Sequence, residues 1–245
     1  MKSKNIKRYT KRLRDIFIFY TKDRNKFPVQ KYGVIFSFGY ACSTAMFLDN
    51  QFLRKFSCPF DWIAGTSFKE RCNIFLNKFE NFIKKEDLVP TGEIKGGFEH
   101  RQLYTNKSNG ILHVHDFNVG KTLDEEYPQV EEKYNRRIKR LLDKIEKSER
   151  TLLVYMEYQE NDNAFASDEE IISFINQANE KYNPSKIDML YIRHNENMSD
   201  GEFSIEKLND NVFIAQCYNK IRGAEGITTG KEKNVRRILQ FFRLK

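Results

Sequence analysis

"YGVIFSFGYACSTAMFLDNQFLRKFSCPFDWIAG", from Tyr32 to Gly65, contains the pattern that decides the fold. The apolar run at 34–38 predicts a strand, and the pattern from Ser43 to Arg54 predicts a helix that follows almost at once. A buried strand that leads directly into a helix is typical of α/β proteins. Cys42 occupies the turn between the two, and its chemistry depends on that position.

The rest of the chain repeats this alternation. Apolar runs predict further strands at 111–115, 151–158, 188–193 and 212–217, and helical patterns lie at 68–84, 128–147 and 168–182. Continuous apolar strands separated by helices indicate parallel strands buried on both faces. We therefore expect a three-layer, Rossmann-like α/β fold with a mostly parallel sheet and helices on both faces.

The charge of the chain is concentrated at its two ends. The net charge is +8 over 245 residues, but residues 1–31 alone hold eleven Lys and Arg against Asp15 and Asp23. With a basic C-terminal end as well, the segment from 32 to 230 carries −6, which argues against nucleic-acid binding by the body of the protein. We expect a basic N-terminal helical arm over 1–31 and a single α/β catalytic-type domain over 32–245. The arm either packs on the domain or contacts an anionic membrane.

The four cysteines form neither a CxxC pair nor a cluster with histidine at metal-ligand spacing. This pattern argues against a zinc site and a disulfide framework, and it fits a reducing cytoplasm. No early apolar run is long enough for a signal peptide or a membrane span. We expect a cytoplasmic protein without metal or cofactor, with contact to the inner membrane face if the arm is an anchor.

Cys42 is the candidate nucleophile. It follows the carboxyl end of a strand, where ligands bind in open α/β sheets, and Gly39 permits a tight turn before it. A thiol at a helix N-terminus meets unsatisfied N–H groups and the positive end of the helix dipole, which favour the thiolate. The same N–H groups suit the oxyanion of an acyl-transfer reaction. The alternative is a buried cysteine that only fills space.

His115 is the candidate base. Together with Asp116 it ends the strand at 111–115, so in a parallel sheet both would reach the same edge as Cys42. His113 alternates to the same side of that strand and is the other candidate, although His115 stands closer to the strand end. Asp116 or Asp61 is expected to orient the imidazole. Each histidine can instead be structural.

Two arginines on the predicted helix at 128–147 lie one turn apart. Arg136 and Arg140 can clamp a phosphate or carboxylate, or simply belong to a solvated helix face. The residues expected to bind substrate lie near the turn, in the "PFDW" segment and on this helix: Gly39, Tyr40, Ser43, Trp62, Arg136 and Arg140.

These motifs together resemble a bacterial family of papain-like cysteine peptidases. The resemblance rests on Ser37, Gly39 and Cys42, on Leu53-Arg54, on Pro59 to Trp62, on His115 to Phe117, and on Tyr134 with Arg136, Arg137 and Arg140. It covers about residues 33–160 and implies a catalytic pair of Cys42 and His115. It also implies, more weakly, a role in surface-polysaccharide biosynthesis.

The sequence therefore predicts a thiol-dependent enzyme that acts through an acyl-enzyme on an acyl- or peptide-type substrate, which can be linked to a glycan. Hydrolysis and acyl transfer to a sugar use the same residues, so a cysteine-dependent acyltransferase is the first alternative. The second is a non-enzymatic protein that binds an anionic ligand through the arginine helix.

Overall fold

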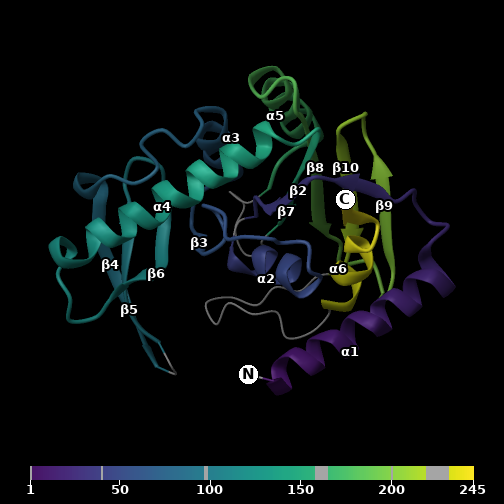
Figure 1. Cartoon of the computed structure of the whole chain (residues 1–245), viewed down its shortest axis with the longest axis horizontal. Helices are drawn as coiled ribbons and strands as arrows, with labels where there is room; N and C mark the ends of the chain where they lie inside the picture. The colour runs from purple at the N-terminus through teal and green to yellow at the C-terminus, as the bar shows by residue number, and fades with distance from the viewer. Residues whose placement is uncertain (1, 40, 97–98, 158–164, 200, 219–231) are drawn as a thin grey trace.

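The sheet with the most strands in the described chain has five and lies in the right-hand half of Figure 1. The computed structural model describes residues 2–39, 41–96, 99–157, 165–199, 201–218 and 232–245. The strands follow the order β2 (Val34–Ser37), β7 (Arg150–Met156), β8 (Lys186–His194), β10 (Val212–Cys217) and β9 (Phe203–Lys207). All neighbours are parallel except β9 and β10. Four predicted strands and the mostly parallel sheet are thus confirmed, and β9 lies outside the predicted elements.

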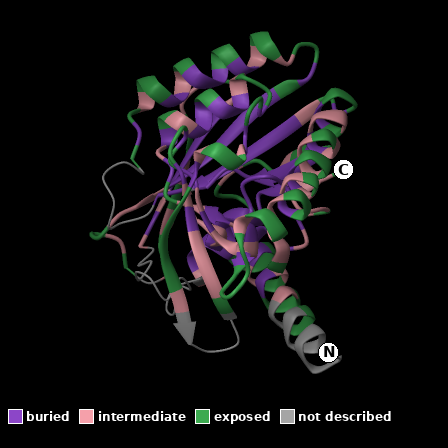
Figure 2. Cartoon of the chain, turned by 90° about the vertical axis from the view of Figure 1, so that its left-hand side faces the viewer, coloured by how far each residue is buried: buried purple, intermediate pink, exposed green. Residues whose placement is uncertain are grey.

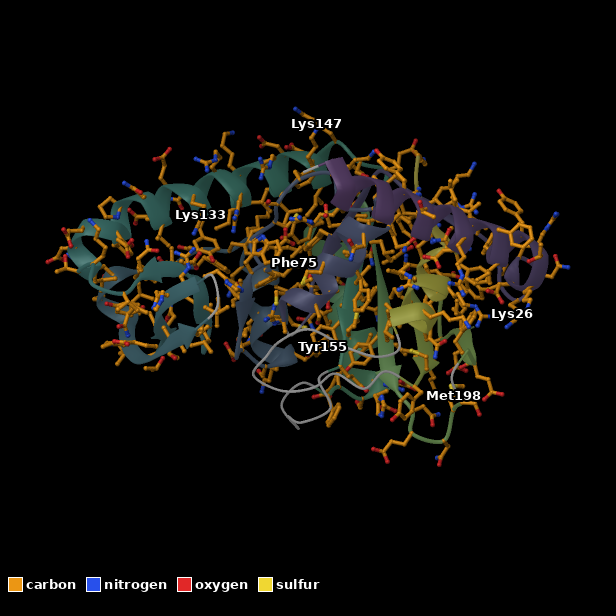
Figure 3. All side chains as sticks on the ribbon, turned by 90° about the horizontal axis from the view of Figure 1, so that it is seen from below. Lys26, Phe75, Lys133, Lys147, Tyr155 and Met198 are labelled. Atoms are coloured by element: carbon orange, nitrogen blue, oxygen red, sulfur yellow. The ribbon has the colours of Figure 1, made fainter. Side chains whose placement is uncertain are left out.

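Alternate residues of these strands enter two separate apolar clusters. Ile35 and Leu152 meet α2 (Cys42–Asn50) and α6 (Glu232–Leu239) in one cluster. Phe36 and Tyr155 meet α3 (Phe68–Leu76) and α5 (Asp168–Lys181) in the other. Figure 2 shows the buried strands between helices whose outer faces are exposed, and Figure 3 shows Phe75 and Tyr155 in the interior. Burial on both faces explains the continuous apolar runs.

A second sheet of four strands is antiparallel. Its order is β3 (Ile63–Ala64), β6 (Leu112–Asn118), β5 (Glu99–Asn106) and β4 (Leu88–Gly96). The prediction that the strand of His113 and His115 joins the parallel sheet is therefore wrong. Only a short turn, closed by a hydrogen bond from Gly110 N–H to Asn106 O of 2.8 Å, separates β5 from β6. Such a turn suffices for an antiparallel pair, whereas a parallel pair needs a crossover of about a dozen residues.

Several predicted element bounds need correction. The helix predicted to reach Arg54 ends at Asn50, and the strand predicted to end at His115 continues to Asn118, so His115 does not stand at the strand end. The helix predicted to reach Lys84 ends at Leu76, because Lys78 and Phe79 take left-handed backbone angles, with φ of 52° and 63°. The helix predicted to begin at Pro128 is α4 (Leu123–Glu146), which begins five residues earlier. A capping box in which Thr122 and Glu125 bond each other's backbone N–H starts this helix. A 3-10 turn at Lys85–Asp87 leads into β4.

The N-terminal segment is tied to the C-terminal one. Helix α1 (Lys2–Ile18) and a π-helical turn (Phe19–Asp23) lie beside α6 (Figure 1). Farther along, β1 (Gln30–Tyr32) pairs in parallel with β11 (Phe242–Leu244). A separate arm over 1–31 stays a prediction. No helix in the described part of the chain is long and apolar enough to cross a bilayer.

Candidate functional site

Cys42 is the first residue of α2, directly after the turn that leaves β2. Its side chain is half-buried, and the preceding Ala41 is the extended N-cap residue. Gly39 is needed here for a different reason from the one predicted. A Cβ atom at this position would lie 2.0 Å from Oγ1 of Thr44, so glycine is required by the close approach of α2 and not by a left-handed turn. Of the neighbouring residues predicted to bind substrate, Ser43 is buried, and Tyr40 lies outside the described residues.

The other three cysteines are buried, and burial disfavours their thiolate forms. Burial raises the pKa of Cys58 and of Cys72 well above the ordinary value, and it raises the pKa of Cys217 to about 12. Cys42 is thus the most accessible thiol of the four, all of which lie in the described part of the chain.

His113 is held in a buried cluster between β6 and α4. Its Nδ1 lies 2.7 Å from Oδ2 of Asp116, which also accepts a hydrogen bond of 2.6 Å from the hydroxyl of Tyr134. The other oxygen of Asp116 accepts from Lys133, which comes from the same helix (Figure 3). Burial opposes the charge of Asp116, but the bonds and charges of His113 and Lys133 lower its pKa. The carboxylate predicted to orient His115 therefore contacts His113.

His115 has a different environment. It is half-buried, and its ring lies edge-on to Trp62, with 6.0 Å between the ring centroids. The strict alternation that would place both histidines on one side of the strand does not hold. The pairing of β5 with β6 shifts between Gln102 and Tyr104, where β6 contains extra residues opposite the partner strand. The bulge separates the environments of the two histidines.

Asp61 anchors the "PFDW" turn behind Trp62. Its Oδ2 lies 2.8 Å from Nη1 of Arg54 and accepts a hydrogen bond of 2.8 Å from the N–H of Cys58. The guanidinium of Arg54 also lies over the Trp62 ring, 5.5 Å from its centroid. Burial raises the pKa of Asp61, against the lowering effect of the Cys58 N–H and Arg54. The described bonds of Asp61 thus shape the loop beside His115, and its predicted role in orienting that ring stays a prediction.

The predicted arginine pair is divided between two roles. Arg140 turns inward, donates to Ser57 O at 2.7 Å and covers the Phe56 ring. Arg136 is exposed and lies 3.5 Å from Glu132 on its own helix. Both still line a surface depression of about 310 Å³ along α4. The clamp therefore stays a proposal.

The carboxyl edge of the parallel sheet carries residues that the sequence patterns did not single out. Glu157 follows β7, the neighbour of β2, and burial raises its pKa. It accepts a hydrogen bond of 3.2 Å from the N–H of His194, and Arg193 lies 3.7 Å from its other oxygen. Glu157 follows an apolar run without a signal of its own, so the sequence patterns did not identify it. In the described part of the chain, no group of three His, Cys, Asp or Glu side chains is arranged to hold a metal ion.

One comparison with known proteins gives a match. Residues 33–197 match the family described as "Putative papain-like cysteine peptidase". No curated protein matches the chain. No solved structure matches it either. The matched segment includes Cys42, the "PFDW" turn, both histidines and α4.

Proposed function

Since the chain belongs to the family described as "Putative papain-like cysteine peptidase", we propose that it is a thiol-dependent hydrolase with Cys42 as its nucleophile. The observation that carries this proposal is the contrast between Cys42 and the three buried cysteines. Cys42 begins a helix at the edge of a mostly parallel sheet, and we take this sheet with its flanking helices as a Rossmann-like, three-layer unit. The helix dipole and the N–H groups of the first turn of α2 favour a thiolate at that point.

His115 is the better base of the two histidines. A general base must approach the substrate, and His115 is half-buried, whereas His113 is fully enclosed by the core. His113 has the bonded carboxylate that a catalytic histidine usually has, but this cluster lies beneath the strand and fixes the position of β6 against α4. We therefore assign His113 and Asp116 a positioning role, and His115 the proton transfer.

The reaction then has two halves. The Cys42 thiolate attacks the carbonyl carbon of the substrate, and N–H groups at the start of α2 hold the oxyanion. The C–N or C–O bond breaks when imidazolium His115 protonates the leaving group, which leaves a thioester on Cys42. His115 next takes a proton from water, and the resulting hydroxide attacks the thioester and regenerates the thiolate. A sugar hydroxyl in place of water would make the same site an acyltransferase.

Intact-mass labelling tests the nucleophile. The wild-type protein is incubated with p-nitrophenyl acetate and with a peptidyl epoxysuccinate, and adducts are mapped by peptide. We expect one adduct, on Cys42, that disappears in Cys42→Ala and persists in the matched control Cys217→Ala. Turnover of the acetyl adduct in water, against its transfer to added N-acetylglucosamine, separates hydrolase from transferase. Absence of an adduct on Cys42, or labelling of a buried cysteine alone, would refute the proposal.

A further inference from the structure

Two ion pairs fix the orientation of α1 and of the π-helical turn that continues it. Oδ2 of Asp15 lies 2.8 Å from Nε of Arg236, and Asp23 accepts two bonds of 2.7 Å from Arg237. Both aspartates are 1% exposed or less. Phe19 between them is buried in the core. The helix therefore presents one defined face to the protein and the opposite face to solvent.

The solvent face carries large apolar side chains. Tyr9, Leu13, Phe17 and Tyr20, named here the apolar stripe, follow one another at helical spacing. Tyr9 and Tyr20, at the two ends, also contact Phe52 and Arg243. Leu13 and Phe17 are 67% and 68% exposed. Figure 1 shows α1 along an edge of the molecule, with only its inner side beside α6. Exposed apolar side chains aligned on one face indicate an interaction surface.

The segment 1–31, which carries the apolar stripe, is strongly basic. Residues 1–31 contain eleven Lys and Arg, and their only acids are Asp15 and Asp23. Because both acids face inward to arginines of α6, they leave no negative charge of this segment on the outer surface. A basic helix with an aromatic and leucine stripe fits the surface of an anionic bilayer.

Other occupants fit this surface less well. A second copy of the chain would bring two segments of like charge together, which costs binding free energy. Nucleic acid would neutralise the cations but leave Leu13 and Phe17 without an apolar partner. An anionic lipid surface supplies both complements at once.

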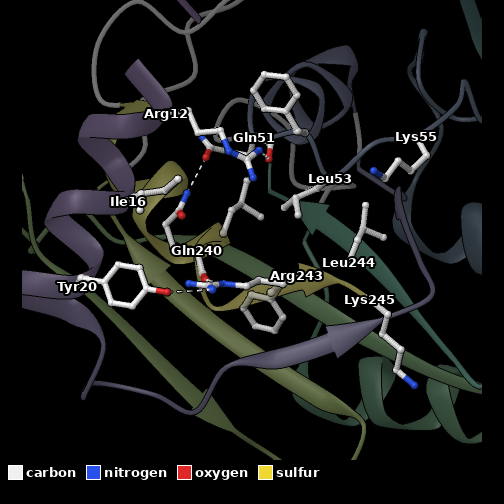
Figure 4. Close-up of a pocket in the computed structure, with 13 residues that line it drawn as sticks. Arg12, Ile16, Tyr20, Gln51, Leu53, Lys55, Gln240, Arg243, Leu244 and Lys245 are labelled. Carbon is white, nitrogen blue, oxygen red and sulfur yellow. Dashed lines mark hydrogen bonds between the residues drawn. The ribbon is translucent and has the colours of Figure 1, made fainter. Parts of the chain in front are cut away.

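A basic pocket adjoins the apolar stripe (Figure 4). It has a volume of about 370 Å³ and lies between α1, the segment after α2 and β11. Four cations line it, Arg12, Lys55, Arg243 and Lys245, and none of the lining residues is an acid. Lys245 also forms an ion pair with Glu149, so the other three supply most of the positive charge. Arg243 is positioned by contacts with Tyr20 of the stripe and with Gln240 O, at 3.4 and 3.3 Å. The pocket thus offers cations next to the apolar stripe, because Tyr20 belongs to both.

We propose that α1 docks this protein on an anionic membrane, with the apolar stripe in the bilayer interface and the basic pocket on a lipid phosphate. This inference is independent of the thiol chemistry. Each cation near the surface contributes roughly a fivefold gain in vesicle binding at low salt. The stripe determines the depth of insertion.

Vesicle co-sedimentation of the full chain tests this proposal. We expect at least tenfold tighter binding to vesicles with 40% phosphatidylglycerol than to pure phosphatidylcholine, and weaker binding as salt rises. Leu13→Ser/Phe17→Ser should lose about tenfold, and its control Phe165→Ser, an exposed apolar residue elsewhere, should bind like wild type. Lys55→Gln/Arg243→Gln should lose more than the control Lys139→Gln/Lys144→Gln on α4. Unchanged circular dichroism shows that the variants are folded.

Several outcomes would overturn the proposal. These are equal binding to both vesicle types, wild-type binding by the stripe variant, and pocket variants that bind like their control. Light scattering that shows a dimer lost in Leu13→Ser/Phe17→Ser would assign the stripe to a second copy. A shift of RNA by the wild type without vesicle binding would assign the surface to nucleic acid. Vesicle binding abolished by inorganic phosphate at constant ionic strength would assign the pocket to a free anion.

Discussion

Nδ1 of His113 lies 2.7 Å from Oδ2 of Asp116, and the same oxygen accepts a hydrogen bond from the hydroxyl of Tyr134. This contact joins two residues of a bulged strand to the middle of α4. His113, which contacts the carboxylate, therefore holds β6 against α4. His115 lies on the same strand, which this contact holds in place.

Asp116→Asn should lower the free energy of unfolding at pH 7 by about 2–3 kcal/mol, because it removes a buried charge bonded to three side chains. The pKa of Asp116 is lowered in the folded state, so its contribution is present above the unfolded pKa near ~4 and is lost as pH falls below it. Urea unfolding should show a smaller difference between variant and wild type at pH 3 than at pH 7. The control is Asp143→Asn, at a half-exposed residue of the same helix α4. A difference that is constant with pH would contradict the assigned ionisation.

Cys42 should be the first thiol alkylated by iodoacetamide at pH 6. The pKa values of Cys58, Cys72 and Cys217 are all raised by burial, so these thiols remain protonated and enclosed. Competitive labelling with peptide mapping measures the four rates in one sample. Equal labelling of Cys217 and Cys42 in the folded protein would remove the argument for a thiolate at the start of α2.

Cys42 and His115 should act as a unit. Each single alanine variant should lose about 10²-fold or more in turnover, and the double variant should be hardly worse, because a base without its nucleophile has nothing to activate. The melting temperature of His115→Ala should stay near that of wild type, since the ring is half-buried.

His113→Ala should differ from His115→Ala by lowering stability. It removes the His113 partner of the buried Asp116 carboxylate, so it should lower the melting temperature by several degrees. If His113→Ala melts like wild type and loses all turnover, while His115→Ala stays active, then the base is His113.

Gly39→Ala should destabilise the protein by about 1–3 kcal/mol through overpacking, because its Cβ would lie 2.0 Å from Oγ1 of Thr44. Thr44→Ala removes that oxygen and should restore part of the loss when combined with Gly39→Ala. Thermal unfolding of the single and double variants measures the coupling. Additive losses in the double variant would show that Thr44 is not the obstacle.

Local sequence patterns determined the strands of the parallel sheet and the position of Cys42. The apolar run of β2 and the helix pattern after it place Cys42 at a strand-to-helix junction, because both elements are encoded in adjacent residues. The parallel part of the sheet was predictable for the same reason, since each of its four strands on its own is a continuous apolar run.

Only the tertiary structure decided which partner each remaining strand and side chain meets. The strand pattern of "HVHDF" does not say that β6 pairs with β3 and β5, nor that a bulge opposite β5 buries His113 with Asp116 and leaves His115 beside Trp62. The outward direction of the apolar stripe on α1 likewise depends on Arg236 and Arg237, more than 200 residues away. Strand partners, bulges and buried ion pairs are contacts between segments distant in sequence, so the local pattern of either segment does not contain them.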